Sequence, residues 1–408
     1  MTDRFHAALQ YLYPRVFPGP EWSLEPIRSL LATLGHPERH YAAVHIGGTN
    51  GKGSVATLVC EALRASGLSV GLYTSPHLVD VRERMVVDER PITRDAFVAW
   101  FEGLHSEIER TRASFFDATT AMALADFAAR GVDVAVIEVG LGGRLDSTNA
   151  IEPAVSAVTR VALEHTDYLG PSLQGIAREK AGIAKRGIPF VIGEETADLR
   201  GVLQETAARA GARVIEVPAG VSYDGPLAMA GPHQRRNAAI AEAVLHALPT
   251  TVRPPREAIH RGFARARLPG RFDRRGPWIF DVAHNPDGIG ALVAALEREQ
   301  PQRPLHGVVG ILGDKDWRAM LEQLLGATDG LWLTDPPSAP AGRRWDLTEV
   351  GRTVGRLGGQ EHPRVIVQPD FGRALGDARI GAGTVLVTGS FHTVGDALGR
   401  LPGFAPLG

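Results

Sequence analysis

The sequence predicts an α/β protein of two domains. Its 408 residues exceed the usual size of one domain. Short apolar runs rich in β-branched residues alternate with segments of helix length, which is the pattern of a mostly parallel sheet flanked by helices. The alternation pauses near residues 268–271 and then starts again. We therefore expect a larger N-terminal α/β domain over residues 1–270 and a smaller Rossmann-like α/β domain over 276–408.

The N-terminal domain is predicted from five apolar runs and two helix-length segments. The helices are expected at 55–66 and 176–185, each next to an apolar run. The predicted strands are 41–46, 70–74, 132–139, 154–161 and 189–192.

The C-terminal domain is predicted to begin a second series after a linker rich in Pro, Gly and Arg at 270–276. Helices are expected at 288–298 and 318–325, and the Pro/Ala-rich segment 336–342 is predicted to be a solvated loop. The predicted strands are 278–282, 306–311, 330–333, 364–367 and 384–387.

Composition and charge exclude several classes of protein. The chain is 44% apolar and 22% charged with a net charge of −2, so it lacks the basic excess of nucleic-acid or membrane-surface binders. No apolar run approaches the ~18 residues that span a bilayer, and the N-terminus lacks the pattern of a secretory signal. The single cysteine, Cys60, lies in an apolar stretch and is expected in the core. We expect a cytoplasmic protein in a reducing compartment.

The strongest motif is a glycine-rich loop between a predicted strand and a predicted helix. It reads Gly48-Thr49-Asn50-Gly51-Lys52-Gly53-Ser54. Glycines let backbone amides curl around phosphate oxygens, and the following helix adds partial positive charge at its N-terminus. Lys52 would neutralise the β- and γ-phosphates, and the Ser54 hydroxyl would bind Mg²⁺. The alternative is a glycine-rich turn that only caps the helix, which the strand–loop–helix context disfavours.

Three further polar residues follow predicted strands or lie nearby. Glu138 ends an apolar strand, where a carboxylate points into the crevice that binds ligands in parallel sheets. A capping or salt-bridged glutamate is the alternative. His165 follows the strand predicted at 154–161, and Lys180 lies in the sequence REKAGI. Taken alone, these two would be a structural histidine and a surface lysine.

The loop departs from the generic P-loop because Gly53 separates Lys52 from Ser54, and this form resembles the Mur ligase superfamily. The whole chain is most similar to the bifunctional dihydrofolate synthase/folylpolyglutamate synthase family. The stretches that carry the resemblance run in order over most of the chain: GTNGKGS (48–54), SPHL (75–78), EVGLGGRLDSTN (138–149), EHTDYLG (164–170), REKAGI (178–183), LPGRFD (268–273), FDVAHNP (280–286), GDKD (313–316) and TGSFHTV (388–394).

The resemblance implies an N-terminal P-loop ATPase domain and a C-terminal amino-acid-binding ligase domain. It implies two Mg²⁺ sites held by Ser54, Glu138, His165 and Lys180, with Lys180 carboxylated to a carbamate. Lys52, His165 and Lys180 would be the catalytic residues. The residues implied in ATP binding are Thr49, Asn50, Gly51, Lys52, Gly53, Ser54, Asn237, Arg271, Asp281 and His284.

The resemblance also implies the substrates, which are a dihydropteroate or reduced folate as acyl donor and L-glutamate as acceptor. Asp117 stands where many relatives have glutamate, so its pterin contact differs in reach. Asp314 and Lys315 are further candidates for binding the amino-acid acceptor. The residues implied in substrate binding are Glu21, Trp22, Ser23, Leu24, Ser75, Pro76, His77, Leu78, Phe116, Asp117, Leu145, Ser390 and His392.

The implied reaction is amide formation through an acyl phosphate that ATP makes from the donor carboxylate. We expect small molecules as partners, with no nucleic acid, no membrane and a monomeric chain. One alternative is a Mur enzyme acting on another acid, although only 47 residues precede Gly48 and leave little room for a nucleotide-sugar-binding domain. The other is an ATP-sensing protein without ligase chemistry, which needs neither a metal-ligand set nor a second domain.

Overall fold

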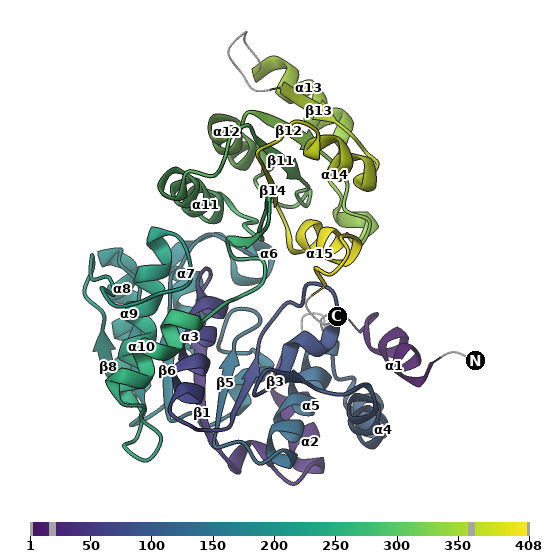
Figure 1. Ribbon diagram of the computed structural model, residues 1–408. Helices are drawn as coiled ribbons and strands as arrows, with labels where there is room; N and C mark the ends of the chain where they lie inside the picture. The colour runs from purple at the N-terminus through teal and green to yellow at the C-terminus, as the bar shows by residue number, and fades with distance from the viewer. Residues whose placement is uncertain (1–2, 16–21, 358–363, 406–408) are drawn as a thin grey trace. The chain divides into compact units, whose positions relative to one another are not determined.

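The computed structural model describes residues 3–15, 22–357 and 364–405 (Figure 1). These residues form two compact units, and each has its own sheet. Unit 1 comprises Met1–Pro76, Arg82–Ala228 and Arg235–Ala266. Unit 2 comprises His77–Val81, Met229–Gln234 and Arg267–Gly408. The α/β class with mostly parallel sheets is confirmed.

Unit 1 is built on an eight-stranded sheet in the described residues, ordered β4-β3-β2-β5-β1-β6-β7-β8. Neighbours from β2 to β8 are parallel, while β3 and β4 add an antiparallel edge that the sequence did not predict. The strands are β1 (Ala42–Gly47), β2 (Val70–Tyr73), β3 (Met85–Val87), β4 (Arg90–Pro91), β5 (Val134–Glu138), β6 (Val155–Val158), β7 (Pro189–Ile192) and β8 (Arg213–Glu216).

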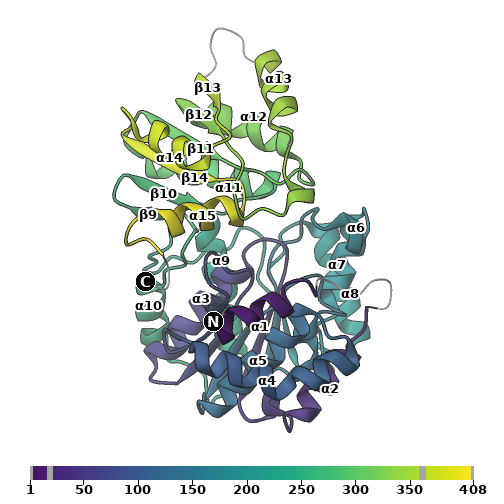
Figure 2. The same ribbon diagram turned by 90° about the vertical axis from the view of Figure 1, so that its right-hand side faces the viewer.

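The helices of the first 266 residues fall into groups on this sheet. Helix α3 packs on β1, β2 and β5 and against α10, while α2, α4 and α5 contact one another and α5 contacts β2 and β3 (Figure 2). They are α1 (Arg4–Leu12), α2 (Glu25–Thr33), α3 (Lys52–Ala65), α4 (Arg94–Thr111), α5 (Phe115–Ala129), α6 (Thr166–Leu169), α7 (Leu173–Ala181), α8 (Ala197–Arg209), α9 (Pro232–Ala247) and α10 (Arg256–Arg265), with 3-10 turns η1 (Pro37–Arg39), η2 (Val81–Arg84) and η3 (Ser147–Ala150).

Two predicted helices have different ends in the structure. Helix α3 begins at Lys52 rather than at residue 55, because Gly51 takes a φ of 92° and the chain turns into the helix there. Helix α7 spans Leu173–Ala181 rather than 176–185, and Gly182 follows it as the cap. The lysine at 180 therefore lies in the last turn of a helix.

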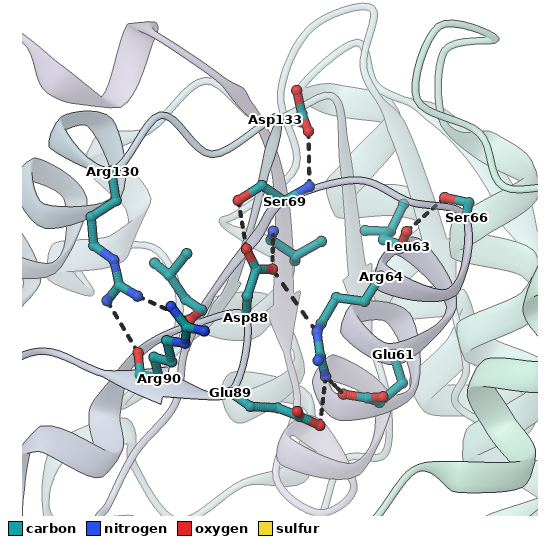
Figure 3. A network of polar contacts seen from close by, with 12 residues as sticks. Glu61, Leu63, Arg64, Ser66, Ser69, Asp88, Glu89, Arg90, Arg130 and Asp133 are labelled. Atoms are coloured by element: carbon teal, nitrogen blue, oxygen red, sulfur yellow. Dashed lines mark hydrogen bonds and ion pairs between the residues drawn. The ribbon is translucent and has the colours of Figure 1, made fainter.

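The C-terminal end of α3 is fixed by a network of charges (Figure 3). Arg64 forms ion pairs of 2.5 Å with Glu61 and 2.9 Å with Glu89. Asp88, in the turn between β3 and β4, accepts hydrogen bonds from Ser69 Oγ (2.8 Å) and Val70 N (2.9 Å). The network joins α3 to the β3–β4 hairpin, so the helix is tied down at the end opposite Lys52.

Unit 2 has a six-stranded sheet in the described residues, ordered β13-β12-β11-β14-β10-β9, parallel except for β9. Alternate residues of each strand face opposite layers. Leu331 and Leu333 of β12 pack with the α11–α12 side, whereas Trp332 packs with the α14–α15 side. The elements are β9 (Asp273–Arg275), β10 (Trp278–Asp281), α11 (Pro286–Glu299), β11 (Leu305–Val309), α12 (Trp317–Ala327), β12 (Gly330–Leu333), η4 (Ala341–Arg343), α13 (Leu347–Leu357), β13 (Arg364–Val367), α14 (Phe371–Arg379), β14 (Thr384–Thr388) and α15 (Phe391–Arg400).

No helix in the described ranges is both long and apolar enough to cross a membrane.

Candidate active site

The glycine-rich loop lies between β1 and α3. Gly48 and Gly51 have φ values of 140° and 92°, which side chains of L-residues rarely allow. The loop therefore turns sharply and α3 starts at Lys52, with Ser54 buried in its first turn. Lys52 Nζ donates a 3.0 Å hydrogen bond to the Thr49 carbonyl. This arrangement presents the N-terminus of a 14-residue helix, which favours an anion such as phosphate.

Neighbouring segments support this loop, through Thr159 and Ala162, which were not predicted, and through Asn237, which was. Thr159, just after β6, donates from Oγ1 to the Asn50 carbonyl at 2.7 Å. Thr49 exchanges two hydrogen bonds with Ala162, at 3.2 and 3.1 Å. The Asn237 amide, predicted to bind ATP, lies so close that a Cβ on Gly51 would be 2.6 Å from its Oδ1. The structure thus brings Asn237 to the loop.

Lys180 is the other cation beside the loop. Its side chain is buried, and Nζ donates a 2.9 Å hydrogen bond to the Gly48 carbonyl. Burial, and next the charge of Lys52, lower the pKa of Lys180 to about 7. A buried lysine with such a pKa is largely neutral at slightly alkaline pH and is then a nucleophile towards CO₂.

Glu138 provides a buried carboxylate at the same edge of the sheet. It ends β5, and its register partner on β1 is Ile46, two residues before Gly48. The Ser75 backbone amide donates to Glu138 Oε2 at 3.0 Å. The strand β5 thus delivers a hard oxygen donor beside the strand that leads into the loop.

His165 lies in a more open position than the other predicted metal ligands. It caps α6 with a φ of 52°, its side chain is 37% exposed, and its Nε2 lies 3.8 Å from Glu164 Oε1. In the part of the chain that the structure describes, no three His, Cys, Asp or Glu side chains converge as a metal site. The predicted ligand set does not require such a group, because two of its four members are a serine and a lysine.

The segment 140–149 binds the helix that carries Lys180. A Cβ on Gly143 would be 2.7 Å from the Glu179 carbonyl oxygen, and Arg144 Nε donates to the Glu179 carboxylate at 3.0 Å. Burial raises the pKa of Asp146 to about 6, and His45 of β1 hydrogen-bonds Thr148 at 2.8 Å. None of these contacts was predicted, because no local motif links the segment 140–149 to α7 or to β1. Leu145 is half-buried there.

Phe116 and Asp117, the two residues predicted to contact the pterin, lie in the first turn of α5. Both carboxylate oxygens of Asp117 accept hydrogen bonds, Oδ2 from Ser114 N (2.9 Å) and Oδ1 from Ser147 Oγ (2.6 Å). Ser114 and Asp117 form the capping box that starts α5, so Asp117 has a structural role that the sequence analysis missed. Phe116 lies against Gly140, where a Cβ would be 2.4 Å from its ring.

The other residues predicted to bind the acyl donor lie in several separate segments. Glu21 lies outside the described residues. Trp22 is half-buried against the core of α7 and α8, and Ser23 and Leu24 lead into α2. The SPHL stretch is divided, with Ser75 and Pro76 in unit 1 and His77 and Leu78 in unit 2.

Unit 2 gathers several predicted residues at the carboxyl edge of its sheet. The Arg271 guanidinium lies 5.1 Å from the centre of the Phe391 ring, and the His284 ring lies 5.5 Å from it. Asp281 ends β10 and accepts hydrogen bonds from Phe272 N (2.8 Å) and Ala283 N (2.9 Å). Burial raises the pKa of Asp281, while the charge of Arg271 opposes the shift.

Ser390 and His392 lie at the start of α15 in unit 2. Ser390 is the buried N-cap, bonded to Thr393 N at 3.1 Å. His392 Nδ1 lies 3.0 Å from Ser338 Oγ. Asp314 forms a 2.8 Å ion pair with Arg343. These residues follow three neighbouring strands and so share one edge of the sheet.

The fold and the loop define a ligase of the Mur type. Residues 46–223 match the Mur ligase middle domain, and residues 270–391 match the Mur ligase glutamate ligase domain. The chain is an ATP-dependent ligase that forms an amide bond.

Relatives narrow this class to one family. The folylpolyglutamate synthase of Lacticaseibacillus casei is 38% identical over 77% of this chain and 81% of its own length. The Escherichia coli FolC structure, a complex with DHPP and ADP, has a TM-score of 0.85 at 32% identity and covers 98% of this chain and 97% of its own. A bifunctional folylpolyglutamate synthase/dihydrofolate synthase from Yersinia pestis, complexed with AMPPNP and Mn, has a TM-score of 0.84 at 32% identity with 98% of each chain covered. The chain belongs to the folylpolyglutamate synthase/dihydrofolate synthase family.

Proposed function

We propose that this enzyme joins L-glutamate to dihydropteroate and to reduced folates, with ATP activating the donor carboxylate as an acyl phosphate. The observation that carries the proposal is the P-loop with two buried groups beside it, Lys180 hydrogen-bonded to Gly48 and Glu138 at the end of the adjacent strand. A carboxylate is a poor electrophile, and phosphorylation supplies a leaving group that the amine of glutamate displaces. In the overall reaction, ATP, the donor acid and the amine of glutamate give ADP, phosphate and the amide product.

Within unit 1, the chain's own groups would bind and orient the nucleotide. Backbone amides at the start of α3 hydrogen-bond phosphate oxygens, and Lys52 places its ammonium beside them. Asn237, packed on Gly51, would hold the loop and touch ATP. In unit 2, Arg271, Asp281 and His284 are the proposed ATP contacts.

The proposed metal ligands are Ser54, Glu138, His165 and carboxylated Lys180. The Glu138 carboxylate and the Ser54 hydroxyl supply the oxygen ligands that suit a hard divalent cation. Both residues are buried, Ser54 in the first turn of α3 and Glu138 at the end of β5. When bound there, Mg²⁺ would neutralise charge on the transferring phosphoryl group. Two such sites are proposed.

The surroundings of Lys180 support its proposed carboxylation. The amine is buried beside a second ammonium, that of Lys52, and both effects disfavour its charged form. Addition of CO₂ to the neutral amine forms an N–C bond and releases one proton. The product is an anion, which removes the repulsion with Lys52 and supplies oxygen ligands.

The donor would lie along Trp22, Phe116 and the SPHL stretch, and the acceptor along Lys315, Ser390 and His392. We propose small molecules as the only partners of a monomer. The presence of one cysteine, buried Cys60, supports a reducing, cytoplasmic setting.

Phosphate release with a panel of acids tests the proposal. Dihydropteroate and tetrahydrofolate should each stimulate release in the presence of ATP, Mg²⁺ and glutamate, and release should fall strongly without glutamate. Stimulation only by a UDP-muramoyl acid would assign the chain to another Mur reaction. Release independent of any acid would mean an ATPase without ligase chemistry.

A further inference from the structure

Three neighbouring strands of unit 2 end in loops that share the carboxyl edge of the sheet. In the order β12-β11-β14, these loops are residues 334–346, 310–316 and 389–390. Thr334 and Thr388, at the ends of β12 and β14, are fully buried, and their hydroxyls have no hydrogen-bond partner among the described residues. Ligands of open parallel sheets bind at this edge.

Residues 335–345, which we call the strap, are fastened to α15. Ser338 N donates to Asp396 Oδ2 at 2.9 Å, and Ser338 Oγ lies 3.0 Å from His392 Nδ1. His392 and Asp396 are one turn apart on α15. Both contacts hold one serine of the strap against the first turns of the helix.

The strap is also stiffened from within. Arg344 donates from Nε to the Ala339 carbonyl (3.1 Å), from Nη2 to the Pro337 carbonyl (3.0 Å) and from Nη1 to Asp335 (2.9 Å). Its donors are therefore used to shape the loop. Arg344 is a framework residue.

The neighbouring arginine has a different orientation. Arg343 uses Nε and Nη2 in a fork on Asp314, at 3.2 and 2.8 Å, which joins the strap to the loop after β11. Nη1 takes no part in that fork. The charge of Arg343 also reaches His392. Burial is the main cause that lowers the pKa of His392, the charge of Asp396 opposes this shift, and the charge of Arg343 adds a smaller lowering effect. Arg343 thus places an oriented cation near the N-terminus of α15.

We propose that the strap selects the amino-acid acceptor by its side-chain carboxylate, with Arg343 as the cation that recognises it and Ser338 and Asp396 as positioning residues. The inference rests on the proposed function, in which unit 2 binds the acceptor. Asp314 fixes the plane of the guanidinium, and a second anion can bind at Nη1. The N-terminus of α15 adds favourable partial charge.

Competition between glutamate and glutamine tests this assignment. The two acceptors match in length and differ in charge. With full-length enzyme, ATP, Mg²⁺ and tetrahydrofolate, Arg343→Gln should lower the ratio of kcat/KM for glutamate to that for glutamine at least ~10-fold. Arg343→Lys keeps the charge without the fork, so its ratio should be intermediate. The KM for ATP and for folate should stay within about twofold.

The pair Arg303–Asp329 provides a matched control. It lies at the opposite edge of the same sheet, with an N–O distance of 3.0 Å and side-chain exposures of 56% and 42%, against 44% and 41% for Arg343–Asp314. Arg303→Gln should leave the ratio at the wild-type value. An unchanged ratio in both Arg343 variants would refute the selection role, while glutamate transfer by the wild type would keep the proposed function intact. A wild type that transfers no glutamate would refute the proposed function itself.

The positioning residues have their own readout. Ser338→Ala and Asp396→Asn should raise the KM for glutamate about three- to tenfold with little change in kcat, because they loosen binding and leave the chemistry intact. Ser338→Thr keeps the hydroxyl and should restore the KM. Asp377→Asn, an exposed aspartate on α14, is the matched control for Asp396→Asn. Equal KM values in Ser338→Ala and wild type would contradict the positioning role.

Discussion

At the residue scale, replacing Lys52 should affect ligation without affecting the stability of the fold. It is half-buried at the start of α3, and its Nζ has a 3.0 Å bond to a loop carbonyl, so it contributes little to the core. Lys52→Ala should lower ligation at least ~10³-fold, the scale of charge stabilisation at a transferring phosphoryl group. Its thermal unfolding should match wild type. Near-normal turnover in the variant would contradict the P-loop assignment.

The second residue-scale prediction concerns Lys180 and pH. Burial lowers the pKa of Lys180 to about 7, so the fraction of neutral amine rises as pH increases from 6 to 8. Only the neutral amine adds CO₂. Carbamate content and activity should therefore rise together over this range at fixed dissolved CO₂. Lys180→Ala should be nearly inactive and partly rescued by a small added carboxylate.

The small number of lysines makes it possible to assign a carbamate to one residue. The sequence has only four lysines, Lys52, Lys180, Lys185 and Lys315. With ¹³C-labelled bicarbonate, a carbamate resonance should appear in the wild type and in Lys185→Ala and be absent in Lys180→Ala. A resonance that survives in Lys180→Ala would assign the modification elsewhere.

At the scale of elements, the P-loop depends on the absence of a side chain at one position. Gly48 has a φ of 140°, and a Cβ there would lie 2.0 Å from Thr159 Oγ1. Gly48→Ala should destabilise the protein by about 1–3 kcal/mol and weaken nucleotide binding. Gly103→Ala, exposed inside α4 with open space around it, should instead stabilise it by about 0.5–1 kcal/mol. Equal unfolding temperatures for the two variants would contradict this account of the loop.

The predictability of elements followed the strength of local signals. The runs 189–192, 330–333 and 364–367 were predicted with the bounds that β7, β12 and β13 have, because short apolar runs between turns are clear signals. Helix α5 was missed because it is buried nearly all round and shows no amphipathic period. The edge strands β3 and β4 have three and two residues, too few for a pattern.

The site was partly predictable for the same reason. The glycine-rich loop, Glu138 and Lys180 were predicted from motifs. In the structure Lys180 hydrogen-bonds the loop at Gly48, and Glu138 lies beside β1, the strand that leads into the loop. Contacts between distant segments, such as Thr159 with Asn50 and His45 with Thr148, have no local signal. Asp117, which was predicted from the resemblance to contact the pterin, also forms the capping box of α5, a second role that the prediction did not include.

At the scale of the whole molecule, we predict two acyl donors. Dihydropteroate and a reduced folate share the pterin and aminobenzoyl parts and differ in which carboxylate they offer. Purified enzyme should ligate glutamate to dihydropteroate and, separately, to tetrahydrofolate, as mass spectrometry of the products would detect. If dihydropteroate yields nothing while tetrahydrofolate is glutamylated, the enzyme has the second activity alone. Each donor should inhibit ligation of the other, because one P-loop serves both.

The most direct test of the acyl-phosphate mechanism is the fate of ¹⁸O in the donor carboxylate. Dihydropteroate or tetrahydrofolate labelled in the reacting carboxylate is incubated with enzyme, ATP, Mg²⁺ and glutamate, and the phosphate is analysed by mass spectrometry. The account predicts one ¹⁸O in each released phosphate, because the donor oxygen attacks the γ-phosphorus and leaves with it when the amine displaces phosphate. Unlabelled phosphate, with the label confined to the amide and the unreacted acid, would contradict it.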